Sequence, residues 1–557
     1  MTLSVAHTRD FDRVASLPRR AITLEDAQAW ATELTPRLAL TADAILRPWQ
    51  ALALAEIVAN DGAWLALPVG VGKTLLSWLA PTVLASKRAL LVVPGSLVAK
   101  TYSDFAALSS QWRRPPSAIR VETREKLSTE GGAETLDAYR PDLIVIDEAD
   151  DLANSRSAAT KRIDRYVVAH DEVRVVAMTG TPARKSIMAY WHLLCWCLRD
   201  RAPVPMREDE ARLWALALDE HGGQPAAPGP LGRTRKAARE WYRTRITQTP
   251  GVVVIDEDSC DAPLTVRLRL AREDEKLDAA FARFLIEQET PGGIPVSDPL
   301  SRWLLDAQLG LGLYTQWCPP PPESWRQARR TVARFVRDTI DATARSAKPL
   351  DTEAQVLRRY PDAPQVGAWL AEKPGFEGTT ECVWLSRSTL DSCLDWLREI
   401  RAEGVPGIVW CGSVDFGRAL AGEAGLAYYG QRGRTDGGDE LHTAPVGASL
   451  VSSWGANKKG FNLQAWPRQL IAMPPQSAKW LEQIFGRSHR SGQREHVIVD
   501  VLATSGGTLD AFETAIAEAR MVRDTLSLTQ KILRADIVRA KPPKTATNEF
   551  RWARRTS

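Results

Sequence analysis

A glycine-rich turn followed by lysine and threonine is the part of this sequence whose residue types most directly suggest chemistry. The run LPVGVGKT, residues 67–74, follows an apolar stretch at 63–67 and precedes an amphipathic stretch at 75–84. A buried strand, a tight glycine turn and the start of a helix together form an anion site, because the first N–H groups of a helix lack partners within it. We therefore expect this turn to bind phosphate.

Each residue of the turn has a separate use. Gly70 and Gly72 accept positive φ angles, so the backbone on either side of Val71 approaches a phosphate closely. Lys73 reaches the β- and γ-phosphates of a nucleotide, and the Thr74 hydroxyl holds Mg²⁺. The complete phosphate-loop pattern has another glycine where this chain has a leucine. A glycine turn that happens to precede Lys-Thr is therefore the alternative.

Carboxylates follow a later apolar run. The stretches at 88–94 and 143–146 are continuous and apolar, as in parallel strands covered on both faces, and the second ends in the tetrad DEAD at 147–150. Carboxylates at the carboxyl end of a parallel strand lie where α/β sheets bind ligands. We expect Asp147 to coordinate Mg²⁺ and Glu148 to orient or deprotonate an attacking water. A solvated acidic loop is the alternative.

Two more segments belong to the same predicted lobe. An apolar strand at 173–178 leads to Thr179, Gly180 and Thr181, which could relay the state of the nucleotide to a bound strand; a plain turn is the alternative. Gln50, upstream of the glycine turn, could present its amide to adenine, or it could be a surface glutamine that opens a helix. The order of these motifs predicts a RecA-like ATPase lobe.

With these motifs the chain resembles the superfamily 2 helicases, and among them the Swi/Snf-type DNA translocases with their compact prokaryotic and phage-encoded members. QIFGRSHRSGQ at 483–493 is similar to the last motif of that group, and LRPWQ at 46–50, VVP at 92–94, DEAD and TGTP are similar to earlier ones. The resemblance implies a second RecA-like lobe with Gln483 as a coupling residue and Arg487 and Arg490 as arginine fingers on the γ-phosphate. Two arginines on an exposed helix that pair with acids are the alternative.

The segment WGANKKGFNL, residues 454–463, resembles the fifth motif of the same family. Gly460 matches the family, and we expect it at the nucleotide site. Two glycines usually stand where this chain has Asn457 and Lys458. We expect Lys458 and Lys459 to lie beside the phosphate track of a nucleic acid.

The region between the lobes is predicted to be an insertion. Residues 265–345 have the pattern of helices with arginine-rich faces, and Arg326 and Arg330 are candidate contacts to DNA phosphates. A solvated helix face balanced by acids is the alternative. The run VVVIDED at 252–258 also ends in carboxylates, but no glycine turn precedes it, so we interpret it as a structural strand near the lobe connection.

We therefore predict an α/β protein made of two RecA-like parallel-sheet lobes, of the P-loop NTPase type of helicase superfamily 2, with a helical insertion between them. The second lobe should contain strands at 383–385, 407–411 and 448–452. The expected divisions are an N-terminal lead-in (1–40), an ATP-binding lobe (41–200), the helical insertion (201–374), the second lobe (375–530) and a flexible basic tail (531–557).

Composition limits the classes of protein that fit. Hydrophobic residues make up 44% of the chain and charged residues 25%, as in ordinary soluble proteins. The formal net charge is only +4, so a nucleic-acid surface must be a local patch. The seven cysteines show no CxxC pair, which argues against zinc and fits a reducing cytoplasm. No apolar run approaches the ~18 residues that a membrane span requires, so we expect a soluble, cytoplasmic protein.

The resemblance implies a function for the whole chain. It predicts ATP hydrolysis with Mg²⁺ that drives movement along duplex DNA or remodelling of it, with RNA the less favoured polymer. Two other interpretations stay open: an RNA-dependent helicase and a non-hydrolysing scaffold of helicase shape. Intact Lys73, Glu148 and Arg487 argue against the scaffold.

Overall fold

The computed structural model describes residues 3–68, 70–182, 186–219, 225–257, 260–294, 296, 299–344, 346, 349–458, 460–540 and 550–553. The chain forms two compact units. Unit 1 comprises Met1–Ser259 and Glu518–Gln530, and unit 2 comprises Cys260–Ala517 and Lys531–Ser557. Each unit contains its own parallel sheet.

Unit 1 is built on a six-stranded parallel sheet with the strand order β3-β2-β4-β5-β1-β6. The strands are β1 (Ala63–Ala66), β2 (Ala89–Val93), β3 (Arg120–Thr123), β4 (Leu143–Ile146), β5 (Arg174–Thr179) and β6 (Val252–Val254). The strands predicted from the four apolar runs are confirmed as β1, β2, β4 and β5. The polar strand β3 gave no such signal because it lies at the edge of the sheet, where three of its four residues are partly exposed.

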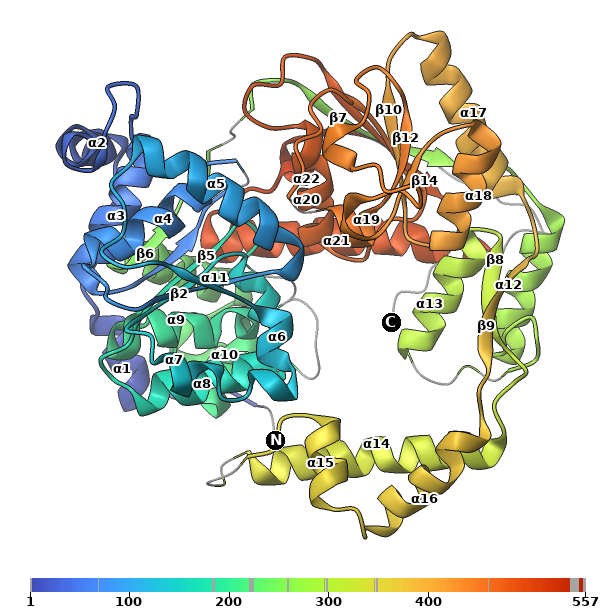
Figure 1. The fold of residues 1–557 in the computed structure, drawn as a ribbon, viewed down its shortest axis with the longest axis horizontal. Coiled ribbons are helices and arrows are strands. Elements are labelled where there is room, and N and C mark those ends of the chain that lie inside the picture. Colours follow the sequence, from blue (N-terminus) through green and yellow to red (C-terminus); the bar gives the residue numbers. More distant parts are fainter. Residues whose placement is uncertain are drawn as a thin grey trace. The chain divides into compact units, whose positions relative to one another are not determined.

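Both faces of this sheet are covered, which explains the continuous apolar runs. Alternate residues of β1 belong to different apolar clusters, Trp64 to one and Leu65 to the other. The cluster of Leu65 includes residues of α3 (Pro48–Asn60), α4 (Lys73–Val83) and α5 (Val98–Gln111). The cluster of Trp64 includes residues of α8 (Ala158–Ala169), α9 (Trp191–Leu198), α10 (Glu208–Leu218) and α11 (Arg235–Thr247) (Figure 1).

The segments at the two ends of unit 1 pack into the same core. The predicted lead-in forms α1 (Arg9–Ser16) and α2 (Leu24–Leu38), and Phe11 of α1 is buried in the cluster of Trp64. Met521 and Leu526, from the returning segment 518–530, join that cluster as well. The short helices α6 (Arg124–Ser128) and α7 (Thr135–Tyr139) complete the described helices of unit 1 longer than one turn.

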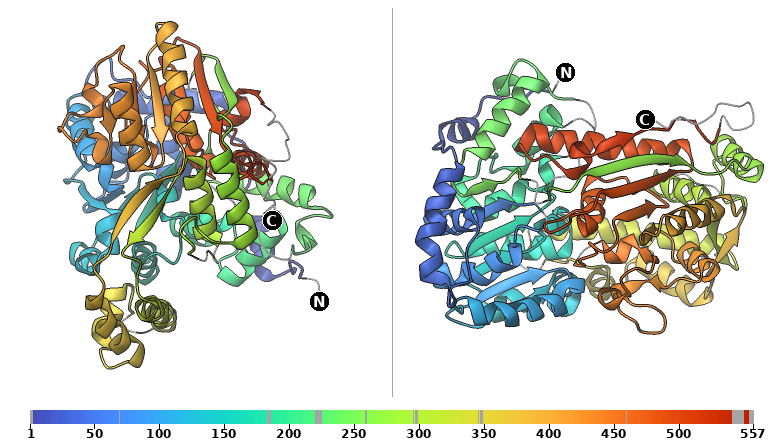
Figure 2. Two further views of the ribbon diagram at one scale, coloured as in Figure 1. Left: turned by 90° about the vertical axis from the view of Figure 1, so that its right-hand side faces the viewer. Right: turned by 90° about the horizontal axis from the view of Figure 1, so that it is seen from above.

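Unit 2 contains a parallel sheet, and Figure 2 shows the ribbon from two further directions. The sheet has seven strands in the order β11-β12-β10-β13-β14-β7-β15. Its strands are β7 (Leu264–Leu270), β10 (Gly407–Cys411), β11 (Tyr428–Tyr429), β12 (Leu450–Ser453), β13 (Arg468–Ile471), β14 (Val497–Ala503) and β15 (Asp536–Val538). Its helices are α17 (Ser388–Ala402), α18 (Val414–Ala424), α19 (Trp454–Asn457), α20 (Ala478–Ser488), the first part of α21 (Gly506–Leu526), and α22 (Lys531–Arg534). The predicted fold class, α/β with two parallel sheets, is confirmed and is consistent with two RecA-like lobes.

Strand β7 lies inside the span 201–374 that the sequence favoured as a helical insertion. Both arginines of this strand pair with acids of neighbouring elements. Arg267 makes two hydrogen bonds, of 2.9 and 2.8 Å, with buried Asp500 of β14. Arg269 makes two with Glu399 of α17, of 2.7 and 2.8 Å. These pairs allow an arginine-rich strand to occupy a parallel sheet.

The insertion of unit 2 therefore follows β7 and ends before α17. It consists of α12 (Glu275–Glu287), α13 (Pro299–Gly310), β8 (Leu313–Cys318), α14 (Glu323–Thr343), α15 (Glu353–Arg359), α16 (Pro364–Glu372) and β9 (Thr379–Trp384). β8 and β9 pair antiparallel as a separate ribbon, and the three helices between them share an apolar cluster of their own. The strand predicted at 383–385 was thus wrongly assigned to the second-lobe sheet, because among the described residues it pairs only with β8.

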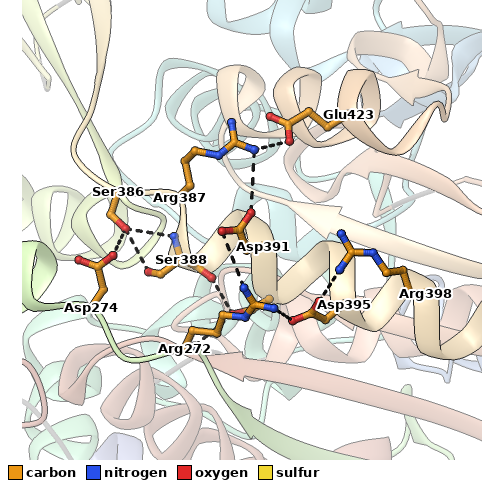
Figure 3. Close-up of polar contacts among 10 residues, drawn as sticks. Arg272, Asp274, Ser386, Arg387, Ser388, Asp391, Asp395, Arg398 and Glu423 are labelled. Atoms are coloured by element: carbon orange, nitrogen blue, oxygen red, sulfur yellow. Dashed lines mark hydrogen bonds and ion pairs between the residues drawn. The ribbon is translucent and has the colours of Figure 1, made fainter.

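Polar contacts tie the two ends of the insertion together (Figure 3). The hydroxyl of Ser386, after β9, donates to the carboxylate of Asp274, before α12, and lies 3.2 Å from Ser388 Oγ. The guanidinium of Arg272, after β7, pairs with Asp395 of α17. Entry and exit of the insertion are therefore held to each other and to the helix that follows.

The C-terminal residues of unit 2 are anchored rather than forming the free arm that was predicted. Strand β15 pairs with β7, and the side chain of Arg551 is buried. Its Nε donates to Thr504 O at 2.7 Å, and its guanidinium lies 3.6 Å from an Asp278 carboxylate oxygen. The expectation of a flexible tail is therefore corrected for the described residues 531–540 and 550–553. The sequence signal, a high density of basic residues, did not show that one arginine would find buried acceptors.

We expect Arg551→Met to lower the free energy of unfolding of unit 2 by about 3 kcal/mol, because it leaves a buried carboxylate without its cation. Burial already raises the pKa of Asp278 despite the opposing charge of Arg551. Arg539→Met is the matched control, since the Arg539–Glu513 pair is largely exposed and should contribute below ~1 kcal/mol. Thermal and denaturant unfolding measure both variants. Equal losses in the two would contradict the anchoring role of Arg551.

Candidate nucleotide site

Three neighbouring strands of unit 1 carry the predicted motifs at their carboxyl ends. The DEAD tetrad follows β4, the TGTP turn follows β5, and the glycine turn follows β1, with β5 between the other two strands. The registers Ile146↔Ala177 and Ala66↔Thr179 align the three strand ends. Because parallel strands end at the same edge of a sheet, residues far apart in the sequence meet there.

The glycine turn has the backbone and the charge that a phosphate site requires. Gly70 and Gly72 have φ angles of 95° and 89°, and no side chain caps α4, which begins at Lys73. Lys73 Nζ donates to the backbone oxygens of Leu67 and Pro68 at 3.3 Å each, and no described carboxylate pairs with it. Uncapped N–H groups and an ammonium without a carboxylate partner are a donor set that fits the phosphates of ATP.

Gln50 is held by the glycine turn. Its Nε2 donates to Val71 O at 2.7 Å and its Oε1 accepts from Arg47 N at 2.9 Å, while Arg47 itself donates to Gly70 O at 3.3 Å. A Cβ at Gly72 would lie 2.3 Å from Gln50 Nε2, so the turn closes directly on this amide. Gln50 and Arg47 therefore fix the shape of the turn. A contact between Gln50 and adenine stays a prediction.

The first two carboxylates of the DEAD tetrad are half-buried at the end of β4. Glu148 N donates to Asp147 Oδ1 at 2.9 Å. Glu148 has a φ angle of 52°, a left-handed conformation that costs a non-glycine residue roughly 1–2 kcal/mol. Carboxylate and hydroxyl oxygens are ligands that Mg²⁺ prefers, and the binding of Mg²⁺ by Asp147 and Thr74 stays a prediction.

The fourth residue of the tetrad links it to the TGTP turn. Buried Asp150 accepts a hydrogen bond from Thr179 Oγ1 at 2.9 Å, and Thr181 N donates to the same Thr179 oxygen at 3.0 Å. Gly180, between the two threonines, is buried, and Thr181 Oγ1 has no hydrogen-bond partner among the described residues. The two predicted motifs are thus joined by a chain of hydrogen bonds.

His192 was not identified from the sequence, where it is a single polar residue in the apolar run WHLLCWC of α9. Its Nε2 lies 2.9 Å from Leu152 O, at the end of the short helix η3 (Ala149–Leu152) that begins inside the tetrad. Burial lowers the pKa of His192 to about 4. The imidazole is therefore neutral, and its Nε2–H donates to the carbonyl group.

We expect unit 1 to become less stable as the pH is lowered, because the folded state resists protonation of His192. The unfolded chain protonates this histidine near pH 6.5 but the folded chain only near pH 4, so between these values the unfolded state binds more protons. The loss approaches about 3 kcal/mol at the lower end of this window. His192→Gln keeps a donor for Leu152 O and should remove the loss, as measured by denaturant unfolding at several pH values.

Asp219 also titrates in this pH range, so the quantity to examine is the difference in the free energy of unfolding between the wild type and His192→Gln at each pH. Burial raises the pKa of Asp219 to about 7, so its contribution to stability increases as the pH falls and opposes that of His192. This contribution is present in both proteins and cancels in the difference. Identical pH profiles for the wild type and His192→Gln would contradict the assignment.

The predicted arginine fingers differ in their surroundings within unit 2. The buried Arg487 side chain donates from Nε to Gln483 O at 2.9 Å and from a terminal nitrogen to Phe461 O at 2.8 Å. Arg490 is partly buried, and among the described residues no hydrogen bond or ion pair of its guanidinium is found. Burial alone lowers the pKa of Arg490. Arg487 thus holds the fifth-motif segment, whereas Arg490 is a desolvated cation without a described counter-ion.

Gln483 lies one helical turn before Arg487 on α20. Its side chain is buried, and neither amide atom has a hydrogen-bond partner among the described residues. A buried amide without partners is energetically costly, so a ligand or a moving segment could satisfy it. Its coupling role stays a prediction.

The unusual residues of the fifth motif have structural roles in unit 2. Asn457 is buried and its Nδ2 donates to the backbone oxygens of Tyr429 and Gly430 at 2.9 Å each, which explains an asparagine in place of glycine. Lys458 Nζ lies 4.6 Å from the centre of the Trp480 ring and donates to Gly455 O. The loop continues to Gly460, whose φ angle is 87°. Lys459 lies outside the described residues.

The arginines singled out on the insertion share one acid. Arg326 and Arg330 of α14 pair with the two oxygens of Glu323, at 2.5 and 2.9 Å. This arrangement favours the alternative of a helix face balanced by acids. Their contact with DNA stays a prediction.

The fold, with two parallel-sheet units, and the candidate site are consistent with an ATPase of the P-loop type. Residues 43–184 match the family described as type III restriction enzyme, res subunit. The matched segment contains the glycine turn, the DEAD tetrad and the TGTP turn, and is similar to the helicase-like ATPases of superfamily 2. No curated protein matches the chain. No helix among the described residues is long and apolar enough to cross a membrane.

Proposed function

We propose that this protein is an ATP-dependent DNA translocase of the Swi/Snf type, in which ATP hydrolysis drives movement along duplex DNA or its remodelling. The observation that carries the proposal is the meeting of the glycine turn, the DEAD carboxylates and the TGTP turn at one edge of the unit 1 sheet. The similarity of residues 43–184 to a subunit of DNA restriction enzymes supports DNA as the polymer. The likeness of 483–493 to the last Swi/Snf motif supports the finer assignment.

In this proposal the residues of unit 1 bind and orient the reactants. Bound ATP with Mg²⁺ supplies the phosphoryl group that water attacks. The N–H groups that follow Gly70, Val71 and Gly72, with the Lys73 ammonium, bind the phosphates; Thr74 and Asp147 hold Mg²⁺. Glu148 orients the attacking water and takes its proton.

Hydrogen bonds inside unit 1 connect the DEAD tetrad to the TGTP turn, and they could couple ATP hydrolysis to the bound polymer. The carboxylate of Asp150 is two residues from Glu148 and holds the Thr179 hydroxyl. A change at the tetrad therefore reaches the TGTP turn, and we propose that the turn contacts the tracked strand. The Arg490 guanidinium, which has no hydrogen bond or ion pair among the described residues, and the buried amide of Gln483 are the groups that unit 2 would contribute to the γ-phosphate and to this coupling.

We expect Lys73→Ala and Glu148→Gln to abolish ATP turnover, with a loss of at least ~100-fold, while the melting temperature stays unchanged. Lys73→Ala removes a phosphate ligand, so ATP affinity should fall as well. Glu148→Gln removes only the base and should bind ATP normally. Steady-state hydrolysis, nucleotide titration and thermal melting give the three measurements. Retained hydrolysis in purified Glu148→Gln would defeat the role of Glu148.

The same hydrolysis assay separates the candidate functions when it is run with duplex DNA, single-stranded DNA, RNA and no polymer. Strongest stimulation by duplex DNA is the expected result. Stimulation by RNA alone would indicate an RNA-dependent helicase. No hydrolysis with any polymer, by protein that binds ATP, would indicate a scaffold.

The two arginines should give different phenotypes. Arg490→Ala should lower kcat by roughly 10³-fold or more with little change in ATP affinity or melting temperature, because its guanidinium has no described contact within unit 2. Arg487→Ala should lower kcat and also the melting temperature, since two backbone oxygens lose a buried donor. A loss of ATP affinity alone in Arg490→Ala would count against a finger.

A further inference from the structure

The chain passes between the two units at three places: at 259/260, at 517/518 inside α21, and at 530/531. The first and last of these crossings are tied together on the side of unit 1. The carboxylate of Asp256 accepts hydrogen bonds from Thr529 N at 2.7 Å and from Thr529 Oγ1 at 2.9 Å. These residues stand just before the two places at which the chain passes from unit 1 to unit 2.

A single histidine ties the same two segments on the side of unit 2. His489 Nε2 lies 2.7 Å from Ala262 O, and His489 Nδ1 lies 3.2 Å from Lys531 Nζ. Ala262 and Lys531 are at the beginning of the two segments that enter unit 2. Both the imidazole and the lysine side chain are buried, with exposed fractions of 2% and 5%.

The chemistry of the two contacts fixes the state of this imidazole. A lysine ammonium only donates hydrogen bonds and a carbonyl oxygen only accepts them. His489 therefore accepts from Lys531 at Nδ1 and donates to Ala262 O from Nε2–H, so it is neutral and in a single tautomer. The backbone N–H of Lys531 donates to the carboxylate of Glu482, on α20, at 2.6 Å. Lys531 is thus held to α20 at both its backbone and its side chain.

His489 is also part of the segment that carries the arginines. It directly follows α20, its N–H donates to Phe485 O at 2.9 Å, and it stands between Arg487 and Arg490. A displacement of either connecting segment therefore acts on the backbone next to Arg490.

We propose that His489 is a positioning residue: it fixes the arginine-bearing end of α20 to both chain segments that enter unit 2, and so makes the placement of Arg490 follow movement at the two crossings. This inference rests on the proposed function, in which Arg490 completes the ATP site. His489 itself acts through Arg490 and has no contact with nucleotide in this scheme.

Three substitutions separate the two contacts. His489→Asn places an oxygen near the position of Nδ1 and keeps the bond from Lys531, whereas His489→Gln extends a donor toward Ala262 O and keeps that bond. His489→Leu keeps neither. We expect His489→Leu to lower the stimulated kcat by ~10-fold or more at unchanged ATP affinity, with smaller losses in the other two. A fall in ATP affinity with unchanged kcat would overturn the proposal.

A double-mutant cycle with Arg490→Ala tests whether His489 acts through that arginine. In single-turnover hydrolysis, His489→Leu should have almost no further effect once Arg490 is replaced. If the loss of rate in the double variant equals the product of the two single losses, His489 contributes independently of Arg490, and the proposal is overturned. Thr389→Val is the matched control, because it removes another buried hydrogen bond of unit 2, from Thr389 Oγ1 to Gly310 O at 2.8 Å. It should lower stability without lowering kcat.

Amide hydrogen exchange tests the tie without any catalysis. His489→Leu should speed exchange in residues 260–264 and 531–535, whereas Thr389→Val should leave both segments protected. Unchanged exchange in these segments overturns the proposal even if the protein is an active ATPase. Faster exchange in a protein without ATPase activity would support the tie and refute the proposed function, so the two failures are distinguishable.

Discussion

The alignment of strand ends in a parallel sheet is the constraint on which the candidate site depends. β5 lies between β4 and β1 in unit 1, and backbone pairing holds the three strands in register. Each strand is followed by a short motif, so the phosphate-binding turn, the carboxylates and the threonine turn are brought to the same edge of the sheet. Burial of both sheet faces fixes this register, since the strands cannot slip without exchanging the residues of two apolar clusters. The chemistry therefore rests on packing far from the reacting atoms.

A layer of buried hydrogen bonds then connects the motifs to one another. The Gln50 amide holds the glycine turn through Val71 O, and the Thr179 hydroxyl holds Asp150. In unit 2 the Arg487 guanidinium holds Phe461 O in the same way. Buried polar groups lose stability when a partner is removed, so these contacts make each motif sensitive to the position of the next. Such sensitivity is what an ATPase requires if hydrolysis is to be converted into movement.

Charges in unit 2 show how a sequence pattern can mislead. The span 201–374 is predicted to be a helical insertion, yet it contains β7, whose Arg267 and Arg269 pair with Asp500 and Glu399. A basic C-terminal stretch suggested a free arm, yet Arg551 is buried against Asp278 and backbone oxygens. In each case the paired carboxylate lies more than a hundred residues away in the sequence. Local composition carries no information about such a partner.

Features that depend on residues close together in the chain can be predicted from the sequence. Continuous apolar runs predicted β1, β2, β4 and β5, and the glycine turn before Lys73 predicted the start of α4, because backbone geometry and burial on both faces leave a local pattern. Which groups meet could be learned only from the folded chain. His192 contacts Leu152 O, and His489 contacts both chain segments that enter unit 2. The guanidinium of Arg490 has no partner among the described residues. The physical reason is that burial, tautomer and ion pairing are properties of contacts between distant segments, and those contacts exist only after the sheets have formed.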